Sequence, residues 1–355
     1  MKRDAFLRDN ACAAVYDGFG MTDPAAAPHD TRKSSSRIGR TRRGWPALAL
    51  AVALGLTGSG PARAQSAVAT PPATGAGAGA SMLARIVDLT GPGMDGRGAG
   101  SAGGAKARAY IEAALTTIGV APAGVDRYAQ PFTTTTKAGT VVSGVNLLAR
   151  CPGRRADAPY LVVSAHYDHL GVRDGTVYPG ADDNASGVAL LLHIAERCVA
   201  NPFDHPLLLA FFDAEELGLK GAQAFVQAPT VPRERIAVNL NFDMVSRSAT
   251  QEIYVAGPGR WPRLKPLLTP VAVKAPINVR FGHDTGGGQE DWTTQSDHGA
   301  FHAAGIPFVY LGVEDHADYH QPTDTPEKIA PAFLDGVAAV ALRVLAALDG
   351  ATAFK

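Results

Sequence analysis

Short apolar runs alternate with amphipathic runs along most of the chain. The apolar runs have the length of strands, and they predict strands at 141–150, 160–165, 207–212, 236–242, 252–256 and 307–311. Helical spacing of apolar residues predicts helices at 105–118, 185–199, 218–227, 260–269 and 331–348. Strands that are apolar throughout are typical of parallel sheets covered on both faces. The pattern therefore predicts an α/β fold, with a single domain whose mostly parallel, mixed β-sheet is sandwiched by helices.

The first 64 residues have the pattern of a secretory leader. Arg42 and Arg43 precede an apolar run from Trp45 to Leu56, and an A-x-A cleavage signature ends at Ala64. This run is shorter than the roughly 20 residues that cross a bilayer. We therefore expect a periplasmic or secreted protein, cleaved after Ala64 and without a stable membrane anchor, although an uncleaved anchor is the alternative. A true start at Met21 would shorten the long segment before the apolar run.

Residues 65–80 contain no charge and are mostly Ala, Gly and Pro, which predicts a disordered linker. Residues 81–355 are expected to form the domain, with no internal repeat and no second domain. A Gly-rich loop at 91–104 lacks the G-x-G-x-x-G spacing of a dinucleotide site. The domain is therefore not expected to bind a dinucleotide there.

Composition and charge exclude some functions. The chain is 46% hydrophobic and 19% charged, as in ordinary soluble proteins, and its formal net charge is zero. Residues 1–64 hold ten Lys and Arg against five Asp and Glu, and the remainder holds 23 against 28. Without a basic surface, a nucleic-acid partner is not expected. Cys12 lies in the leader, while Cys151 and Cys198 could form a disulfide or remain free thiols. The oligomeric state stays unknown from the sequence.

Three apolar runs end on side chains that can bind metals. LLLAFFDAEELG places Glu215 and Glu216 after a strand, LVVSAHYD ends on His166 and Asp168, and IAVNLNFD ends on Asp243. In open parallel sheets, ligands bind outside the carboxyl ends of the strands. Three strands that converge there with imidazole and carboxylate groups indicate a metal-dependent hydrolase.

Each of these groups also has a simpler interpretation. His166 could be only a polar strand terminus, and the Asp182-Asp183 pair could cap the following helix, whose dipole favours carboxylates. Glu215 and Glu216 could be a solvated helix start. Buried together, however, they would raise each other's pKa unless a cation compensated them. One could then bind a metal while the other acts as a general base.

Further histidines are harder to assign. His320 lies on a turn-rich loop, where it is free to reach a site. His193 is expected to pack in a helix and His205 to lie at the surface. Spacing alone does not decide the role of five further histidines: His169, His283, His298, His302 and His316.

The chain resembles the M28 family of co-catalytic zinc peptidases, which includes bacterial aminopeptidases. The matching segments, in family order, are AHYDHLG, GADDNASG, FFDAEELGLKGA, NFDM, SDHGAF and YHQPTDT. A weaker match, GRGAGSAGGAKARAYIEAALTTIG, extends the resemblance to nearly the whole domain. Six motifs in order are specific, whereas any one alone would be weak.

The resemblance implies roles for seven residues and two zinc ions per chain. His166, Asp183 and Asp243 match the ligands of one zinc, and Asp183, Glu216 and His320 those of the other. Asp183, rather than Asp182, matches the carboxylate that bridges the ions. Glu215 matches the general base, and Asp168 the residue that orients His166. The peptide bond Asp183–Asn184 is a candidate for the cis bond often found there.

The implied activity is metal-assisted hydrolysis of peptide bonds, most simply as an aminopeptidase acting on peptide substrates. The chain departs from the family pattern at one position. Some members have a Tyr that stabilises the oxyanion where this chain has Thr293, and Trp292 or Tyr319 could take over that role. The rivals are an M20-type carboxypeptidase, which needs a lid domain, and a glutaminyl cyclase, which uses one zinc. A non-catalytic binding protein is a third alternative, although it should have lost ligands or the base.

Overall fold

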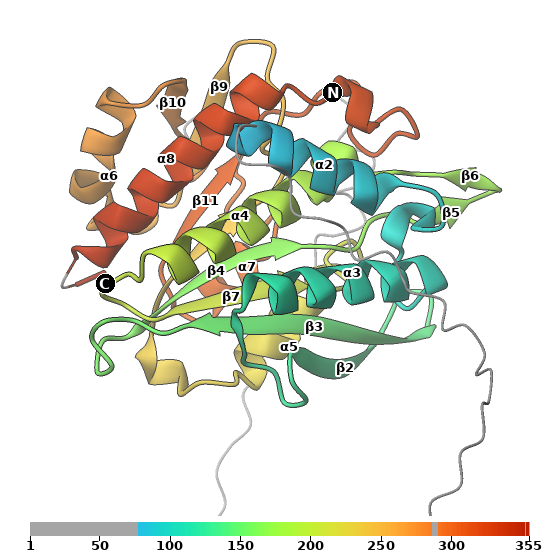
Figure 1. Ribbon diagram of the computed structural model, residues 1–355, viewed down its shortest axis with the longest axis horizontal. Coiled ribbons are helices and arrows are strands. Elements are labelled where there is room, and N and C mark those ends of the chain that lie inside the picture. Colours follow the sequence, from blue (N-terminus) through green and yellow to red (C-terminus); the bar gives the residue numbers. More distant parts are fainter. Residues whose placement is uncertain (1–76, 286–289, 352, 355) are drawn as a thin grey trace, which may run out of the picture. The chain divides into compact units, whose positions relative to one another are not determined.

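The computed structural model describes residues 77–285, 290–351 and 353–354 (Figure 1). The predicted leader and its cleavage site lie outside the described residues. The helices are α2 (Ala78–Thr90), α3 (Ala102–Ile118), α4 (Gly187–Ala200), α5 (Lys220–Gln227), α6 (Leu264–Val273), α7 (His298–Ala303) and α8 (Pro331–Asp349). Short helical turns are η1 (Asp95–Arg97), η2 (Ala181–Ser186), η3 (Arg233–Arg235) and η4 (Pro326–Lys328).

One large mixed sheet organises the domain, with strand order β1-β3-β7-β4-β8-β11-β9-β10 and β2 paired on β3. Its central strands β7, β4, β8 and β11 run parallel, while β3 and β9 run antiparallel to their neighbours β7 and β11. The strands are β1 (Ala121–Pro122), β2 (Ala129–Thr135), β3 (Val141–Cys151), β4 (Tyr160–His166), β7 (Leu207–Phe212), β8 (Ile236–Phe242), β9 (Glu252–Ala256), β10 (Asn278–Phe281) and β11 (Phe308–Gly312). A separate hairpin pairs β5 (Val172–Arg173) with β6 (Thr176–Val177). The predicted α/β fold is confirmed.

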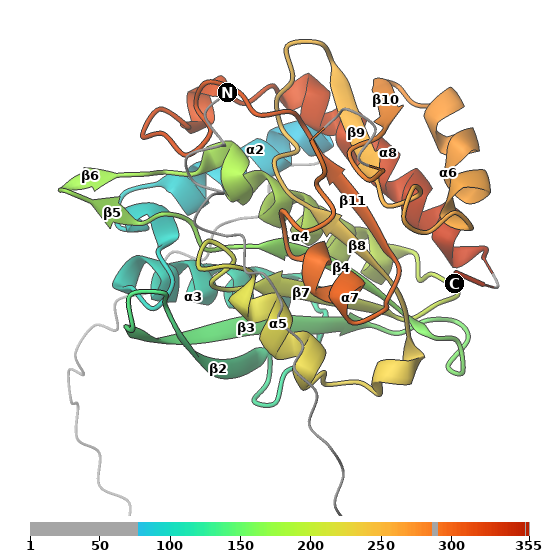
Figure 2. The same ribbon diagram turned by 180° about the vertical axis from the view of Figure 1, so that it is seen from behind.

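Helices cover both faces of the sheet. Alternate residues of each central strand point to opposite faces, so Val163 enters one core and Val162 the other. The larger core lies under α2, α3, α4 and α8 (Figure 1), and the smaller one under α5 and α7 (Figure 2). Because both faces are buried, the central strands are mostly apolar along their length, as the sequence pattern indicated. The polar exceptions Ser164, Asn239 and Asn241 hydrogen-bond to one another across β4 and β8.

Two element predictions need correction. The first described helix begins at Ala78, inside the stretch predicted to be linker, because Met82, Ile86 and Leu89 form an apolar stripe with helical spacing. The Ala-rich and Gly-rich composition before it hides that stripe. Helix α6 begins at Leu264 rather than at 260. Pro262 lies just before it, where proline is compatible with a helix start.

One described helix, α8, is long and apolar enough to cross a membrane by length and composition. Its apolar residues are instead largely buried, and it packs against α2 and α6. It is therefore a core helix of this domain.

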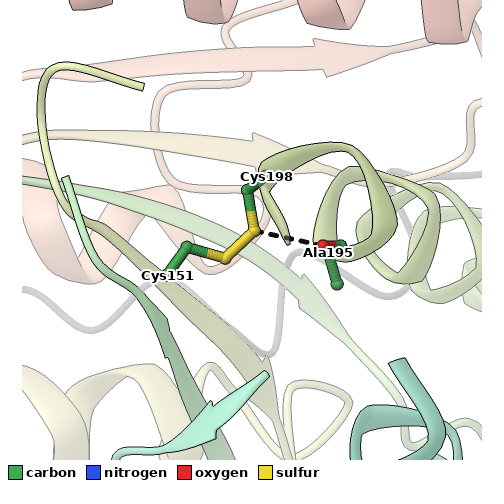
Figure 3. Close-up of a disulfide and its surroundings, with 3 residues drawn as sticks. All are labelled: Cys151, Ala195 and Cys198. Atoms are coloured by element: carbon green, nitrogen blue, oxygen red, sulfur yellow. Dashed lines mark hydrogen bonds between the residues drawn. A yellow bond between two sulfur atoms is a disulfide. The ribbon is translucent and has the colours of Figure 1, made fainter. Parts of the chain in front are cut away.

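A disulfide joins Cys151, at the end of β3, to Cys198 in α4 (Figure 3). Their Cα atoms lie 6.2 Å apart, and both residues are buried. The bridge settles the alternative that the sequence left open. It links β3, which pairs with β7 in the sheet, to the helix that follows the Asp183 loop.

Replacing both cysteines with alanine should lower the free energy of unfolding by about 2–4 kcal/mol. The bridge closes a loop with a sequence separation of 47, and a loop of that size restricts the unfolded chain by about 4 kcal/mol in the chain-entropy description. Denaturant unfolding of the oxidised protein and the Cys151→Ala/Cys198→Ala variant measures the difference. A reductant should destabilise the natural chain but not the variant; equal stability of both oxidised proteins would contradict this role.

Candidate metal centre

Three parallel strands bring the predicted site residues to one edge of the sheet. β4 ends at His166, which lies in register with Phe212 at the end of β7. On the other side of β4, β8 ends at Phe242 and is followed by Asp243. The strand ends thus carry His166, Asp243 and the Glu215-Glu216 pair to adjacent positions, as the sequence predicted.

A first group of metal-type ligands surrounds His166. Its Nε2 atom lies 3.3 Å from Asp243 Oδ1 and 3.5 Å from Asp183 Oδ1. Glu215 belongs to the same group, since one ligand atom each of His166, Glu215 and Asp243 lie within 4.8 Å of one another. His166 is buried and Glu215 is half-buried. The first group therefore combines the imidazole of His166, the carboxylates of Asp183 and Asp243, and the half-buried Glu215.

A second group lies on the other side of Asp183. His320 Nε2 lies 3.2 Å from both Asp183 Oδ2 and Glu216 Oε2. His169 joins it, with Nδ1 at 2.7 Å from Glu216 Oε1. Asp183 thus directs Oδ1 toward the first group and Oδ2 toward the second. All five ligands predicted from the sequence are brought together.

The Asp183 loop is held by side chains from two other loops. The peptide bond Asp183–Asn184 is cis, as the family resemblance predicted. Asp324, which follows His320, accepts hydrogen bonds from the backbone N–H groups of Asp182 and Asp183 at 3.0–3.1 Å. Asp182 itself accepts from Ser246 and contacts His316. Asp182 is therefore engaged away from the cluster, which fits the choice of Asp183 as the shared carboxylate.

Asp168 contacts both the imidazole and the glutamates. Its main-chain carbonyl lies 3.1 Å from His166 Nδ1, and its Oδ1 lies 3.7 Å from the same atom. The carboxylate also accepts hydrogen bonds from the backbone N–H groups of Glu215 and Glu216 at 3.0 and 3.3 Å. It thus fixes the turn that carries both glutamates, in addition to its contact with His166.

Arg97 is a supporting residue that sequence reasoning missed. Its guanidinium is buried and donates to the main-chain carbonyls of Tyr167, Leu89, Pro179 and Gly180. The Tyr167 carbonyl follows His166 in the chain, the Leu89 carbonyl belongs to α2, and those of Pro179 and Gly180 lie in the loop that precedes Asp183. Arg97 belongs to the Gly-rich loop, and nothing in the spacing of that loop indicates a buried cation.

The spacing of the ligand atoms fits zinc. Ligands held at about 2.0–2.1 Å around a tetrahedral zinc lie about 3.3 Å from one another. The contacts of His166 with Asp183 and Asp243, and of His320 with Asp183 and Glu216, are 3.2–3.5 Å. Mixed imidazole and carboxylate ligands are also a usual zinc donor set. The residues present therefore fit a zinc site on each side of Asp183.

The charges of the cluster explain its unusual pKa values. Burial lowers the pKa of His320, but Glu216 and Asp183 outweigh it and raise the pKa to about 11. Burial also lowers the pKa of His166, but the charges of Asp243 and Glu215 outweigh burial and raise this pKa well above its usual value. Burial, with the nearby charge of Glu216 adding to it, raises the pKa of Glu215 well above the ordinary range. Divalent cations would compensate this crowded negative charge.

Zinc binding should release protons. The neighbouring carboxylates raise the pKa of both imidazoles and so favour their protonated forms, whereas each imidazole must be neutral to bind a metal. Because a proton must leave His320 when zinc binds, each unit rise in pH favours that release about tenfold, and the apparent affinity of the His320 site should increase about tenfold per pH unit between pH 6 and 8. Zinc titrations by calorimetry, in buffers of different ionisation enthalpy, measure the release directly. Heats that are identical in all buffers would contradict it.

The side chains considered for the oxyanion have different surroundings. Thr293 donates its hydroxyl hydrogen to Asp291 and accepts from Arg260. Trp292 is buried and stacks on His283 at 3.6 Å between ring centroids. Tyr319 is partly exposed and stacks on the ring of His320 at 3.9 Å. Of the two proposed substitutes for the missing Tyr, only Tyr319 is next to a predicted metal ligand.

The assignment of one histidine was wrong, and the structure places another that the sequence left open. His205 was predicted at the surface but is buried, because it follows the loop that packs on Asp349 and its Nδ1 contacts the carbonyl of Pro159 at 2.8 Å. His169, which spacing left open, lies in the second ligand group. Its signal in the sequence is its place three residues after His166, on a loop without periodicity.

Comparison with known proteins agrees with these motifs. The family model "Peptidase family M28" matches residues 146–345. Aminopeptidase YwaD of Bacillus subtilis is 32% identical over 181 residues, which are 47% of this chain and 36% of YwaD. A probable leucine aminopeptidase of Arthroderma otae is 27% identical over 183 residues, covering 48% of this chain and 49% of that protein. The chain therefore matches about a third to a half of the length of these curated relatives.

Solved structures share the fold. BSAP, a zinc aminopeptidase from Bacillus subtilis, superposes with a TM-score of 0.60 at 19% identity, over 75% of this chain and 94% of that chain. Porphyromonas gingivalis glutaminyl cyclase superposes with a TM-score of 0.61 at 20% identity, over 75% and 97%. The fold alone therefore does not separate these two activities, and the site residues must do so.

Proposed function

This chain belongs to peptidase family M28, and from that premise we propose that it is an exported aminopeptidase that uses two zinc ions. The proposed substrates are peptides with a free N-terminus. The names of the relatives support aminopeptidase action, and the ligand groups on the two sides of Asp183 support the metal count.

The position of Asp183 is the main observation that supports two metal ions. One of its oxygens lies near His166 in the first group, and the other lies near His320 in the second. A carboxylate placed between two such groups is suited to hold two cations at once. Zinc ions held by these residues would supply a Lewis acid for the scissile carbonyl and would lower the pKa of a water molecule, so that it could lose a proton to a nearby base.

Glu215 is the proposed general base. It is half-buried beside His166 and Asp243, and its backbone is fixed by Asp168. Burial and the nearby charge of Glu216 raise its pKa above the ordinary range of a carboxyl, and a raised pKa favours a group that accepts a proton and returns it. In the proposed reaction, Glu215 takes the proton of the attacking water and passes it to the leaving amine. Tyr319 is the proposed donor to the developing oxyanion.

The proposed export rests on the leader pattern and on the disulfide. Disulfides persist in the periplasm and outside the cell and are rare in the reducing cytosol. The Cys151–Cys198 bridge is therefore compatible with the predicted cleavage after Ala64.

The rival functions fit the domain less well. An M20-type lid would interrupt the chain between Asp243 and His320, but there the described residues form β9, β10 and β11 of the main sheet and helices α6 and α7. A glutaminyl cyclase needs one zinc, whereas two ligand groups are present. A non-catalytic binding protein does not need a complete ligand set with a base beside it.

Hydrolysis of aminoacyl nitroanilides tests the proposal. Substrates with a free amine should be cleaved, a chelator should stop cleavage, and zinc should restore it. The same substrates with a blocked amine serve as the control. Cleavage of blocked substrates alone would contradict aminopeptidase action, and formation of pyroglutamate from an N-terminal glutaminyl peptide without hydrolysis would favour the cyclase.

A further inference from the structure

His169 is a histidine of the metal centre that lies outside the five-ligand set. It follows His166 by three residues, on the loop after β4, and its side chain is fully buried. The ring is held against Gly180, where an added Cβ would lie 2.5 Å from the ring atoms Cγ and Cδ2. Gly180 also has a φ of +61°, which favours glycine. The loop that leads to Asp183 therefore leaves space for this imidazole.

The Nδ1 atom of His169 points into the second ligand group. It lies 2.7 Å from Glu216 Oε1 and 3.7 Å from Asp183 Oδ2. Among the described residues, neither this nitrogen nor Glu216 Oε1 has a hydrogen-bond partner of acceptable geometry. Buried polar atoms without such partners are rare and call for a ligand or a cation.

His169 and His320 approach the same two carboxylates from different directions. Glu216 directs Oε1 toward His169 and Oε2 toward His320, and Asp183 Oδ2 lies near both imidazoles. The ring centroids of the two histidines are 5.8 Å apart, and the planes are inclined by 60°. Two imidazoles and two carboxylates are a complete donor set for a four-coordinate zinc.

We propose that His169 is a further ligand of the second metal ion, beside Asp183, Glu216 and His320. This inference rests on the proposed dinuclear function. It makes the two sites unequal, because the second has four protein ligands and the first has three: His166, Asp183 and Asp243. Sites closed by four protein ligands are typical of structural zinc, and sites with three keep an open position for water. The open position therefore belongs to the first site, beside Glu215.

A different role for His169 would be to hydrogen-bond Glu216 and orient it. Loss of such an outer partner typically lowers metal affinity by about 10–100-fold. His169→Gln separates the two roles, because glutamine can still donate a hydrogen bond to Glu216 but is a poor zinc ligand. His205→Gln is the matched control, since His205 is also buried and its ring contacts the Pro159 carbonyl and the ring of Phe354 rather than the metal centre.

The test uses the full chain loaded with Co²⁺ or Zn²⁺. Each coordinated imidazole keeps one N–H, so Co²⁺-loaded protein should show three shifted, exchangeable imidazole N–H resonances, and His169→Gln should show two. Competition with a chromophoric chelator should give a loss of more than about 100-fold in affinity at one site of this variant, and none in His205→Gln. If the variant does not fold, the number of imidazole N–H resonances in the wild-type protein still shows whether His169 binds the metal.

The outcomes separate this inference from the proposed function. Two bound ions with only two imidazole resonances in the natural chain would overturn the role of His169 and leave the proposed function standing. Three resonances without any nitroanilide cleavage would retain His169 as a ligand and overturn the aminopeptidase. Fewer than two bound ions would overturn both.

Discussion

Glu215→Gln should lower turnover by about 10²–10⁴-fold while both zinc ions stay bound. Glutamine is nearly the same size as glutamate and should leave the backbone turn at this position unchanged, but it cannot accept the proton. Glu215 lies beside the first ligand group, and Asp168 fixes its backbone, so the geometry of the ligands should not change. Steady-state kinetics on a free-amine nitroanilide, together with elemental analysis of the same sample, measure both effects.

The adjacent Glu216 supplies the matched control. Its two oxygens face His169 and His320, so Glu216→Gln should lower metal content as well as turnover. Zinc lost from Glu215→Gln but retained in Glu216→Gln would mean that the roles of the two glutamates are reversed.

Asp183→Asn should weaken both zinc sites and abolish measurable turnover. Each oxygen of Asp183 lies near the imidazole of a different site, so removal of its charge affects both. The loss in affinity should exceed the roughly 10–100-fold that follows removal of an outer partner, because a direct ligand is changed. Chelator competition gives the two affinities, and asparagine preserves the shape of the buried side chain.

Asp182→Asn is the control for this change. Asp182 is buried next to Asp183, but its carboxylate contacts Ser246 and His316 rather than the cluster. This variant should be less stable and yet bind two zinc ions. Loss of only one ion from Asp183→Asn would show that its carboxylate serves a single site.

Strands β3, β4, β7, β8, β9 and β11 could be predicted from the sequence for a physical reason, whereas β2 and β10 were not predicted. Parallel strands buried on both faces are nearly continuous apolar runs, and their carboxyl ends lie at one edge of the sheet. Polar residues directly after such runs, as with His166 and Asp243, must therefore meet. The resemblance supplied what periodicity could not, namely the choice of Asp183 over Asp182 and the position of His320 on a loop.

Other parts of the site have no local signal. Arg97 acts through main-chain carbonyls, which any sequence offers, and Asp324 holds backbone N–H groups of a loop more than 140 residues away. His169 enters the cluster through the path of its loop, which has no period. The pairing of Cys151 with Cys198 depends on how α4 lies on the sheet, and that depends on tertiary packing.

Anomalous X-ray scattering at the zinc edge, on crystals of the zinc-loaded protein, tests the central claim most directly. Two peaks are expected, one on each side of the Asp183 carboxylate, with His166 and Asp243 at the first and Glu216 and His320 at the second. A single peak, or two peaks that do not share Asp183, would contradict the dinuclear centre.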